Sequence, residues 1–202
     1  MSNIILVLAT HNTGKVREFK LFFKDSHVTL KYLSEFRDIP PFKESGNTFE
    51  EIAVNKAKFV AECLEIPSIA DDSGLAVECL NGSPGIFSAR YAGKYADDSK
   101  RNRRLLSEMR GKDNRNASFI CAIAIAKPDG KFLVYTGKCS GIILKEPLGV
   151  NGFGYDPLFY YPPLKRTFAQ ISPEEKTRIS HRGIAMQKVK DDMNKIFNWL
   201  LE

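Results

Sequence analysis

The chain has 202 residues, which is enough for one large domain with its own hydrophobic core. Its 43% hydrophobic and 27% charged residues exclude a disordered chain, and its widely spaced cysteines exclude the common zinc and thiol redox motifs. The net charge of +6 suits an anionic ligand. Met1–Ala9 is too short for a signal peptide and no apolar run could span a membrane, so we expect a cytoplasmic protein with no membrane partner.

The N-terminal segment predicts a strand, a polar loop and a helix. Ile4–Ala9 is an unbroken aliphatic run, typical of a strand buried on both faces, and apolar residues recur at helical spacing from Val16 to Phe23. The loop between them, Thr10–Lys15, offers hydroxyls, a glycine and a lysine at a helix start, a combination that can bind phosphate. An ordinary capped helix with a solvent-facing lysine is an equally good interpretation. Ala9 and Val16 exclude a P-loop motif.

A second helix follows a weaker strand candidate at residues 28–36. Thr48–Glu51 fits a capping box, and the apolar residues from Phe49 to Leu64 fall on one helical face. Glu44 precedes this helix and is either a metal ligand or a solvated loop residue. Lys56 lies on the polar side of the helix and by itself is interpreted as a surface residue.

Asp71 and Asp72 form the most distinctive local pattern. Ile69 and Ala70 predict the end of a buried strand, so the two carboxylates are expected at a strand terminus, where α/β folds commonly bind ligands. Adjacent carboxylates repel each other unless a cation, a proton or basic side chains compensate, which favours a divalent metal. The alternative is an Asp-Asp-Ser-Gly turn with no ligand.

The middle of the chain predicts a third helix and a hairpin. Residues 81–93 are expected to form an ordered loop, and Asp97–Ser99 starts a helix whose basic face we interpret as solvated rather than nucleic-acid-binding. Ala117–Ala126 and Phe132–Thr136 are strand-like runs around a turn, and a separate strand is expected at Cys139–Leu144. Antiparallel strands beside strand-helix units indicate an α/β fold with a mixed sheet.

The last third combines a glycine-rich aromatic loop with a basic helix start. Gly149–Pro157 contains three glycines, two aromatics and Asp156, which suits either a purine pocket or aromatic packing in the core. His181 and Arg182 precede a single predicted helix with an apolar stripe from Val189 to Leu200. The pair can bind a phosphate or a base carbonyl, although surface or capping roles are more common for such a pair.

Taken together, these motifs show that the chain resembles the inosine triphosphate pyrophosphatase family, which hydrolyses noncanonical purine nucleoside triphosphates. The resemblance covers nearly the whole chain in order: Ala9–Lys15, Glu44–Gly46, Thr48–Phe49, Asp71–Leu75, Pro84–Gly85, Ser88–Tyr91, Gly152–Pro157, Lys176 and Ser180–Arg182. It implies a two-lobed α/β structure with an elongated mixed sheet, flanking helices and an active site in the central cleft. A homodimer and a Mg²⁺ cofactor are also implied.

The resemblance further implies individual roles. Glu44 and Asp72 would bind Mg²⁺, and Asp72 would activate the attacking water. The triphosphate would bind to Thr10, His11, Asn12, Thr13, Gly14, Lys15, Lys56 and Lys176; Ser73 and Arg90 would line the site; and Phe153, Gly154, Tyr155, Asp156, His181 and Arg182 would form the base pocket. The chain departs from the family pattern at Ile52, usually Asn, and Gln170, usually Glu.

Two other functions compete with this hypothesis. The nearer is a related pyrophosphatase that acts on modified pyrimidine triphosphates. The more distant is a nucleotide-sensing or nucleic-acid-binding protein without catalysis. The presence of Glu44, Asp71 and Asp72 favours an enzyme, with no nucleic-acid partner.

Overall fold

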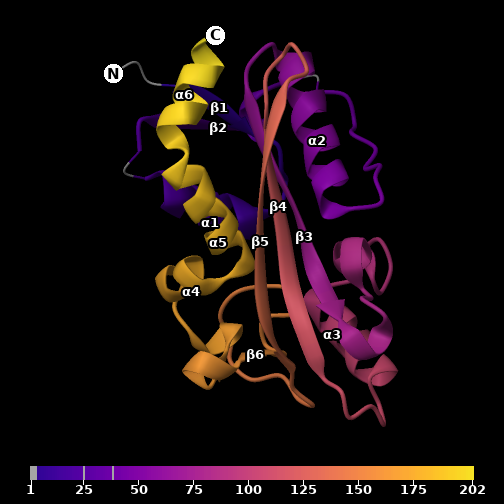
Figure 1. The fold of residues 1–202 in the computed structure, drawn as a ribbon. Helices are drawn as coiled ribbons and strands as arrows, with labels where there is room; N and C mark the ends of the chain where they lie inside the picture. The colour runs from indigo at the N-terminus through magenta and orange to yellow at the C-terminus, as the bar shows by residue number, and fades with distance from the viewer. Residues whose placement is uncertain (1–3, 25, 38) are drawn as a thin grey trace. The chain divides into compact units, whose positions relative to one another are not determined.

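A computed structural model of the chain describes residues 4–24, 26–37 and 39–202, which form one mixed sheet with helices around it (Figure 1). The strand order is β2-β1-β3-β4-β5-β6-β7. The strands are β1 (Ile4–Leu8), β2 (Val28–Tyr32), β3 (Ser68–Val77), β4 (Asn116–Ala126), β5 (Phe132–Ile143), β6 (Phe159–Tyr161) and β7 (Arg166–Thr167). The helices are α1 (Thr13–Phe23), α2 (Phe49–Leu64), α3 (Asp98–Glu108), α4 (Pro173–Ile179), α5 (His181–Asp191) and α6 (Met193–Leu201).

The sheet contains both strand directions. β1 pairs in parallel with β2 and β3, whereas β6 pairs antiparallel with β5 and β7. The α/β class and the mixed sheet predicted from the sequence are therefore confirmed. No helix in the described ranges is long and apolar enough to cross a membrane.

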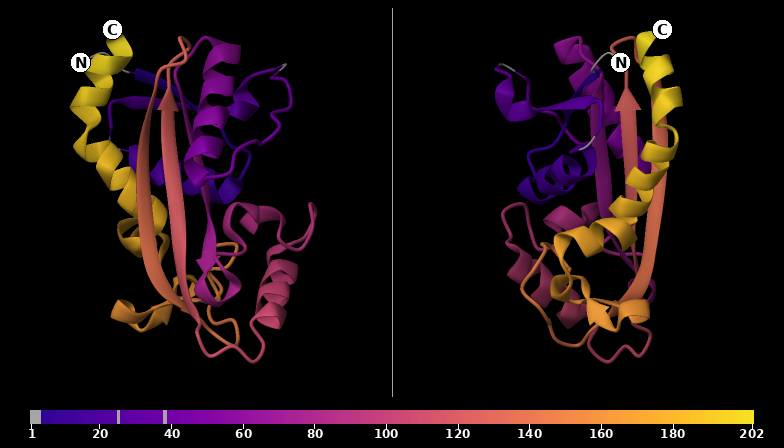
Figure 2. Two further views of the ribbon diagram at one scale, coloured as in Figure 1. Left: turned by 45° about the vertical axis from the view of Figure 1, so that its right-hand side comes forward. Right: turned by 90° about the vertical axis from the view of Figure 1, so that its left-hand side faces the viewer.

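The chain divides into two compact units, and the first combines the two ends of the chain with part of its centre. It comprises residues 1–72, 121–136 and 184–202. Its largest core joins β1 and β4 to α1, α5 and α6 through side chains such as Leu6, Phe19, Ile123 and Ile196. Helix α2 lies on the opposite side of these strands from α5 and α6, as the views agree (Figures 1 and 2).

The second unit comprises residues 73–120 and 137–183. Its core joins the second half of β3 to α3, β6 and the segment around residue 168. Phe119, Phe159 and Phe168 form an aromatic cluster there, with ring centroids 4.6 to 6.0 Å apart. Aromatic burial of this size is a major source of stability. The glycine-rich loop of residues 149–157 is joined to the residue after Phe168, because the N–H groups of Val150 and Asn151 donate hydrogen bonds of 3.1 and 3.0 Å to the carbonyl of Ala169.

The strand-loop-helix predicted at the N-terminus is present. β1 ends at Leu8, which pairs with Ile69 of β3, and the chain then enters α1. Asn12 caps α1 by accepting hydrogen bonds from the backbone N–H groups of Gly14 and Lys15. One face of β1 is less buried than predicted, because Ile5 is 45% exposed. The polar loop thus leaves the sheet at the carboxyl end of a parallel strand.

Three predicted boundaries were wrong. β3 does not end at Ala70 but continues to Val77, so Asp71 and Asp72 lie within a strand rather than at its terminus. β5 is one strand of 12 residues, where the sequence predicted two strands separated near Gly137. The single C-terminal helix is two helices separated at Asp192. In the two strands, continuous pairing with neighbours overrides the weak strand propensity of aspartate and glycine.

Candidate functional site

The first candidate site residues surround Asp71 in the first unit. Its side chain is fully buried, and its Oδ2 lies 3.1 Å from Lys15 Nζ. Lys15 also donates a hydrogen bond of 3.2 Å to the backbone carbonyl of Asp71. Because β1 stops at Leu8 while β3 continues, the lysine at the start of α1 reaches β3 just beyond the end of β1. The Asp71 carboxylate therefore holds the Lys15 ammonium group at the end of the Thr10–Lys15 loop.

Asp72 has a different environment from its neighbour. Its Oδ1 lies 3.9 Å from Lys56 Nζ, which also lies 3.2 Å from Glu44 Oε1. Successive side chains of a strand point to opposite faces, which explains why Lys15 contacts one aspartate side chain and Lys56 the other. Burial raises the pKa of Asp72 to about 6, with the Asp71 and Glu44 carboxylates adding to the increase and Lys15 and Lys56 opposing it.

Glu44 and Asp72 fit a small divalent cation. Asp72 Oδ2 is buried and accepts no hydrogen bond from any described residue. Within the same part of the chain, no three His, Cys, Asp or Glu side chains form a complete metal cage. Mg²⁺ typically binds through one or two carboxylates together with waters and substrate phosphates, so two carboxylates with one uncompensated oxygen suit it. A bound cation would also oppose the effect of burial, which is the main cause of the raised pKa of Asp72, and the repulsion from Asp71 and Glu44 that adds to it.

The start of α1 supplies further groups for an anion. The first turn of this helix has no acidic residue, and its N-terminus carries the positive end of the helix dipole. His11, Asn12 and Thr13 are exposed there, while Lys15 is only partly exposed. The start of α1 thus brings a helix N-terminus and Lys15 beside the buried Asp71 carboxylate.

In the second unit, an aromatic ring lies against two cations. Lys176 Nζ is 4.5 Å and the Arg182 guanidinium carbon 5.9 Å from the centroid of the Phe153 ring. Lys176 is held in place by a buried ion pair of 2.6 Å to Asp156 Oδ2, the same atom that accepts a hydrogen bond from the backbone N–H of Phe153. Asp156 thus fixes both the ring and one of its cations.

Arg182 and His181 are anchored from other directions. Arg182 is 2% exposed and donates a hydrogen bond of 2.7 Å to Ser73 Oγ. The ring of His181 stacks on Phe119 at a centroid distance of 4.7 Å. An aromatic face with fixed planar donors beside it can stack on a base and donate to its carbonyl oxygens.

The comparisons with known proteins decide the family. The sequence model of the Ham1 family matches residues 6–192. The chain belongs to the Ham1 family. A relative from Desulfotalea psychrophila, named dITP/XTP pyrophosphatase, is 49% identical over 97% of this chain and 88% of its own length. A relative of the same name from Syntrophobacter fumaroxidans is 46% identical over 99% of this chain and 86% of its own length.

Solved structures agree with the fold of this Ham1 protein. A HAM1 protein from Coxiella burnetii has a TM-score of 0.88 and 39% identity, over 95% of this chain and 99% of that one. The Ham1 protein of Staphylococcus aureus has a TM-score of 0.84 and 42% identity, over 95% and 98% of the two chains. The resemblance predicted from the sequence is confirmed.

The structure gathers several of the predicted site residues of the Ham1 chain, together with Asp71, into two groups. Glu44, Lys15, Lys56, Asp71 and Asp72 lie together in the first unit. The second group is Ser73, Phe153, Asp156, Lys176 and Arg182 in the second unit.

Two of the predicted residues differ in environment from the roles that the resemblance implied, and for Tyr155 the structure follows the alternative of aromatic packing in the core. Tyr155 is 4% exposed and donates a hydrogen bond of 2.9 Å to the Ser88 carbonyl, so its ring belongs to the core of the second unit. Arg90 is exposed, and its guanidinium lies 5.1 Å from the centroid of the Phe87 ring.

Two residues of α3 that position the aromatic loop were missed. Asp98 accepts a hydrogen bond of 2.7 Å from the N–H of Gly154, and Asn102 donates one of 3.1 Å to the carbonyl of Gly154. The sequence marked Asp98 only as part of a helix start, and nothing in the pattern points from α3 to a loop more than 50 residues away.

Two glycines of the aromatic loop provide a matched pair of substitutions. Gly152 and Gly154 both have positive φ, +75° and +64°. A Cβ at residue 152 would overlap Asp156 Oδ2, whereas a Cβ at residue 154 would meet nothing within 4 Å. We expect Gly154→Ala to lower the free energy of unfolding by about 1 kcal/mol and Gly152→Ala by about 3 kcal/mol, because the second also displaces the Asp156–Lys176 pair. Urea unfolding measures both, and equal losses would contradict this account.

Proposed function

We propose that this Ham1 protein hydrolyses dITP, ITP and XTP to the nucleoside monophosphate and pyrophosphate. The two curated relatives that are 49% and 46% identical carry the name dITP/XTP pyrophosphatase. The observation that carries the proposal is the arrangement of Asp71 and Asp72, in which one carboxylate holds Lys15 and the other has a buried oxygen and a raised pKa. This arrangement provides a proton acceptor and cations within one small region.

We assign the proton-accepting role to Asp72. In the metal-free protein, a pKa of about 6 keeps this carboxylate ionised at neutral pH and makes it a stronger proton acceptor than an ordinary aspartate. The water oxygen then bonds to the α-phosphorus, and the bond from that phosphorus to the bridging oxygen breaks, which releases pyrophosphate. Lys15, Lys56 and the N–H groups at the start of α1 would neutralise charge on the phosphates.

We propose Mg²⁺ as the cofactor, with Glu44 and Asp72 as its protein ligands. The metal would supply charge neutralisation at the phosphate oxygens. A homodimer, a cytoplasmic location and the absence of nucleic-acid or membrane partners complete the proposal. They are supported by the family resemblance, and size-exclusion chromatography with light scattering tests the dimer.

Substrate selectivity follows from the groups around Phe153. Hypoxanthine and xanthine carry an oxygen at C6, where adenine carries an amino group. Donors directed at this oxygen reject adenine, since a buried donor would face another donor. We assign this role to Arg182, with His181 beside it, because the guanidinium is buried and lies beside the Phe153 ring.

Arg182→Ala is expected to lower the ratio of kcat/KM for dITP over dATP by about 100-fold, because the planar donors are lost. Steady-state kinetics with both nucleotides measures the ratio. Arg178→Ala is the matched control, since it makes the same change at an exposed arginine outside the site. Unchanged discrimination in Arg182→Ala, with a normal melting temperature, would assign base selection to other groups.

The test of the function is product analysis with dITP, XTP, dATP, dGTP and dUTP, each with Mg²⁺. Monophosphate and pyrophosphate from dITP and XTP alone would support the proposal. Turnover of dUTP instead would favour the pyrimidine pyrophosphatase. Orthophosphate and a diphosphate would mean attack at the γ-phosphorus, and no turnover with any nucleotide would favour a binding protein.

A further inference from the structure

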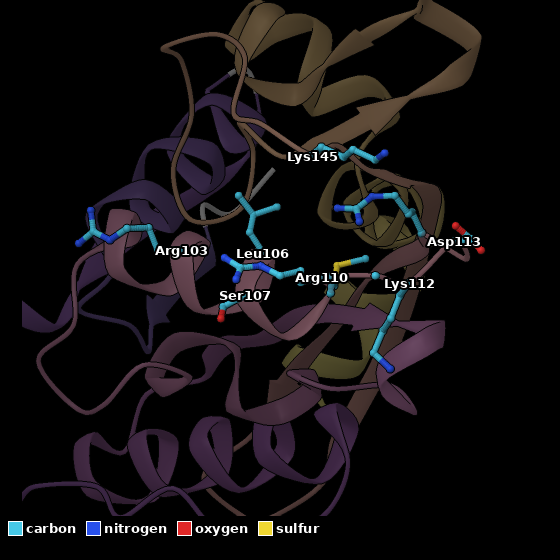
Figure 3. A pocket seen from close by; sticks show the side chains of 10 residues that line it. Arg103, Leu106, Ser107, Arg110, Lys112, Asp113 and Lys145 are labelled. Carbon is cyan, nitrogen blue, oxygen red and sulfur yellow. The ribbon is translucent and has the colours of Figure 1, made fainter.

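A hollow in the second unit lies apart from the residues to which we have assigned substrate and metal. It has a volume of about 680 Å³ and is formed by the end of α3, the segment that follows it and Lys145 (Figure 3). The side chain of Leu106 points into it, with Lys145 on one side and Arg110 on the other. Its volume is in the range of sites for small organic ligands.

The hollow concentrates positive charge. Five basic side chains line it, Arg103, Arg110, Lys112, Arg115 and Lys145, against one acidic side chain, Asp113. Like charges gathered at one place repel each other, so this arrangement of cations is unfavourable unless an anion or solvent compensates the charge. An anion is therefore the ligand class that this surface attracts.

The cations of the hollow differ from two other arginines of α3 in that they have no carboxylate partner among the described residues. Arg101 and Arg104 on the same helix pair with Asp98 and Glu108. Within the described part of the chain, Arg110, Lys112 and Lys145 have no ion pair. Their charges remain available to a ligand, whereas those of Arg101 and Arg104 are compensated inside the protein.

Part of the hollow is already rigid and part is apolar. Arg115 donates hydrogen bonds of 2.6 and 2.9 Å to the carbonyls of Ile143 and Leu144, which fixes its guanidinium in place. Two of the lining residues are apolar: Leu106, which is half-buried, and Met109, which is buried. One fixed guanidinium among further cations, together with apolar side chains, suits a ligand with phosphate groups at one end and a flat, weakly polar group at the other.

We propose that this hollow is a second anion site, which takes a nucleotide-sized phosphorylated ligand without hydrolysing it. The proposal goes beyond the pyrophosphatase reaction, since none of the lining residues belongs to the two groups assigned to it. A small ligand fits better than a nucleic acid. The basic side chains surround one hollow, and the residues that line it include no aromatic ring for stacking successive bases.

The test measures binding of ATP, in EDTA and at low ionic strength, by isothermal titration calorimetry. The pocket variant is Arg110→Glu with Lys145→Glu, which reverses the charge on both sides of Leu106. The control variant is Lys138→Glu with Lys190→Glu, which makes the same change of net charge at exposed lysines outside the hollow. Lys15→Ala serves as the variant of the proposed triphosphate loop.

The proposal expects binding that survives in Lys15→Ala and in the control variant but weakens at least about tenfold in the pocket variant. Equal weakening in both charge-reversal variants would reduce the effect to net charge and overturn it. The proposal would also be overturned if the wild type bound no ATP, or if only Lys15→Ala lost ATP binding. A single-stranded oligonucleotide that binds the hollow about 100-fold more tightly than ATP would replace the small ligand by a nucleic acid.

Turnover of dITP separates this proposal from the pyrophosphatase proposal. The pocket variant is expected to keep wild-type turnover, and its loss in a folded variant would make the hollow part of the hydrolytic site. If the wild type hydrolyses no nucleotide, the pyrophosphatase proposal fails while the calorimetry still decides the fate of the anion site.

Discussion

Asp72→Asn is expected to lower dITP turnover by about three orders of magnitude. The substitution removes both the proposed proton acceptor and one of the two metal ligands, and the loss of a general base alone typically lowers rates roughly 10²- to 10⁴-fold. Steady-state kinetics with saturating dITP and Mg²⁺ measures the effect on kcat. Glu62→Gln, an equal change of charge on the exposed face of α2, is the matched control and should keep full activity. Turnover above a tenth of wild type would remove Asp72 from the role of base.

The same substitution is expected to stabilise the metal-free protein near pH 8. The pKa of Asp72 is raised to about 6 in the folded protein from an ordinary value of 3.8, so the folded state binds the proton more tightly than the unfolded state does. The ionised group therefore destabilises the fold above about pH 6, and this loss disappears as the pH falls towards 4. The amide introduced by Asp72→Asn carries no charge and should raise the free energy of unfolding at pH 8 by up to about 3 kcal/mol.

Asp71→Asn is the informative comparison, because it should have the opposite effect. Asp71 forms a buried ion pair with Lys15, and removal of one partner of such a pair typically costs about 3 kcal/mol or more. Urea unfolding in EDTA at pH 8 and pH 5 measures all three proteins. If both asparagine variants were destabilised at pH 8, the raised pKa of Asp72 would be contradicted.

Lys176→Met should lower the free energy of unfolding by about 3 to 5 kcal/mol, since it leaves the Asp156 carboxylate buried without its ammonium. The two side chains are 6% and 3% exposed, so water screens this pair very little. The substitution also removes the cation that lies over Phe153, and we expect KM for dITP to rise. Arg178→Met, at an exposed position of the same helix, should change stability by less than about 0.5 kcal/mol.

A double-mutant cycle shows whether the loss comes from the pair itself. Lys176→Met combined with Asp156→Asn removes both charges, so the double variant should be more stable than the sum of the two single losses predicts, by about 1 to 3 kcal/mol. Urea unfolding of the four proteins gives this coupling energy. A coupling near zero would mean that Lys176 stabilises the fold through packing on Phe153 and Phe168 rather than through its charge.

Local patterns in the sequence predicted most of the elements but few of their limits. The N-cap at Thr48 and the apolar run of β1 depend on neighbours in the chain, and both are present. The predicted capping box is formed only in part, because the Glu51 side chain accepts from the N–H of Asn47 rather than from that of Thr48. The continuation of β3 through Asp71 and of β5 through Gly137 depends on the strands beside them, which no local pattern records. Propensity alone therefore placed breaks where the sheet has none.

The candidate site shows the same division. The adjacent aspartates stood out because two carboxylates in sequence must repel each other. Lys15 pairs with Asp71 rather than with Asp72 because of the register of β1 and β3. The two paired residues are 56 positions apart in the sequence. The hydrogen bonds that join Gly154 to Asp98 and Asn102 likewise depend on how α3 packs against the loop, and only the structure shows them.

The position of both aspartates within β3 also limits where insertions and deletions can occur in this sequence. In a strand, insertion of one residue moves every later side chain to the other face. An insertion between Ser68 and Ala70 would therefore exchange the surroundings of Asp71 and Asp72, and would turn one toward Lys56 and the other toward Lys15. The turn from Lys127 to Lys131 carries no such constraint, so we expect insertions and deletions to be tolerated there and eliminated in β3.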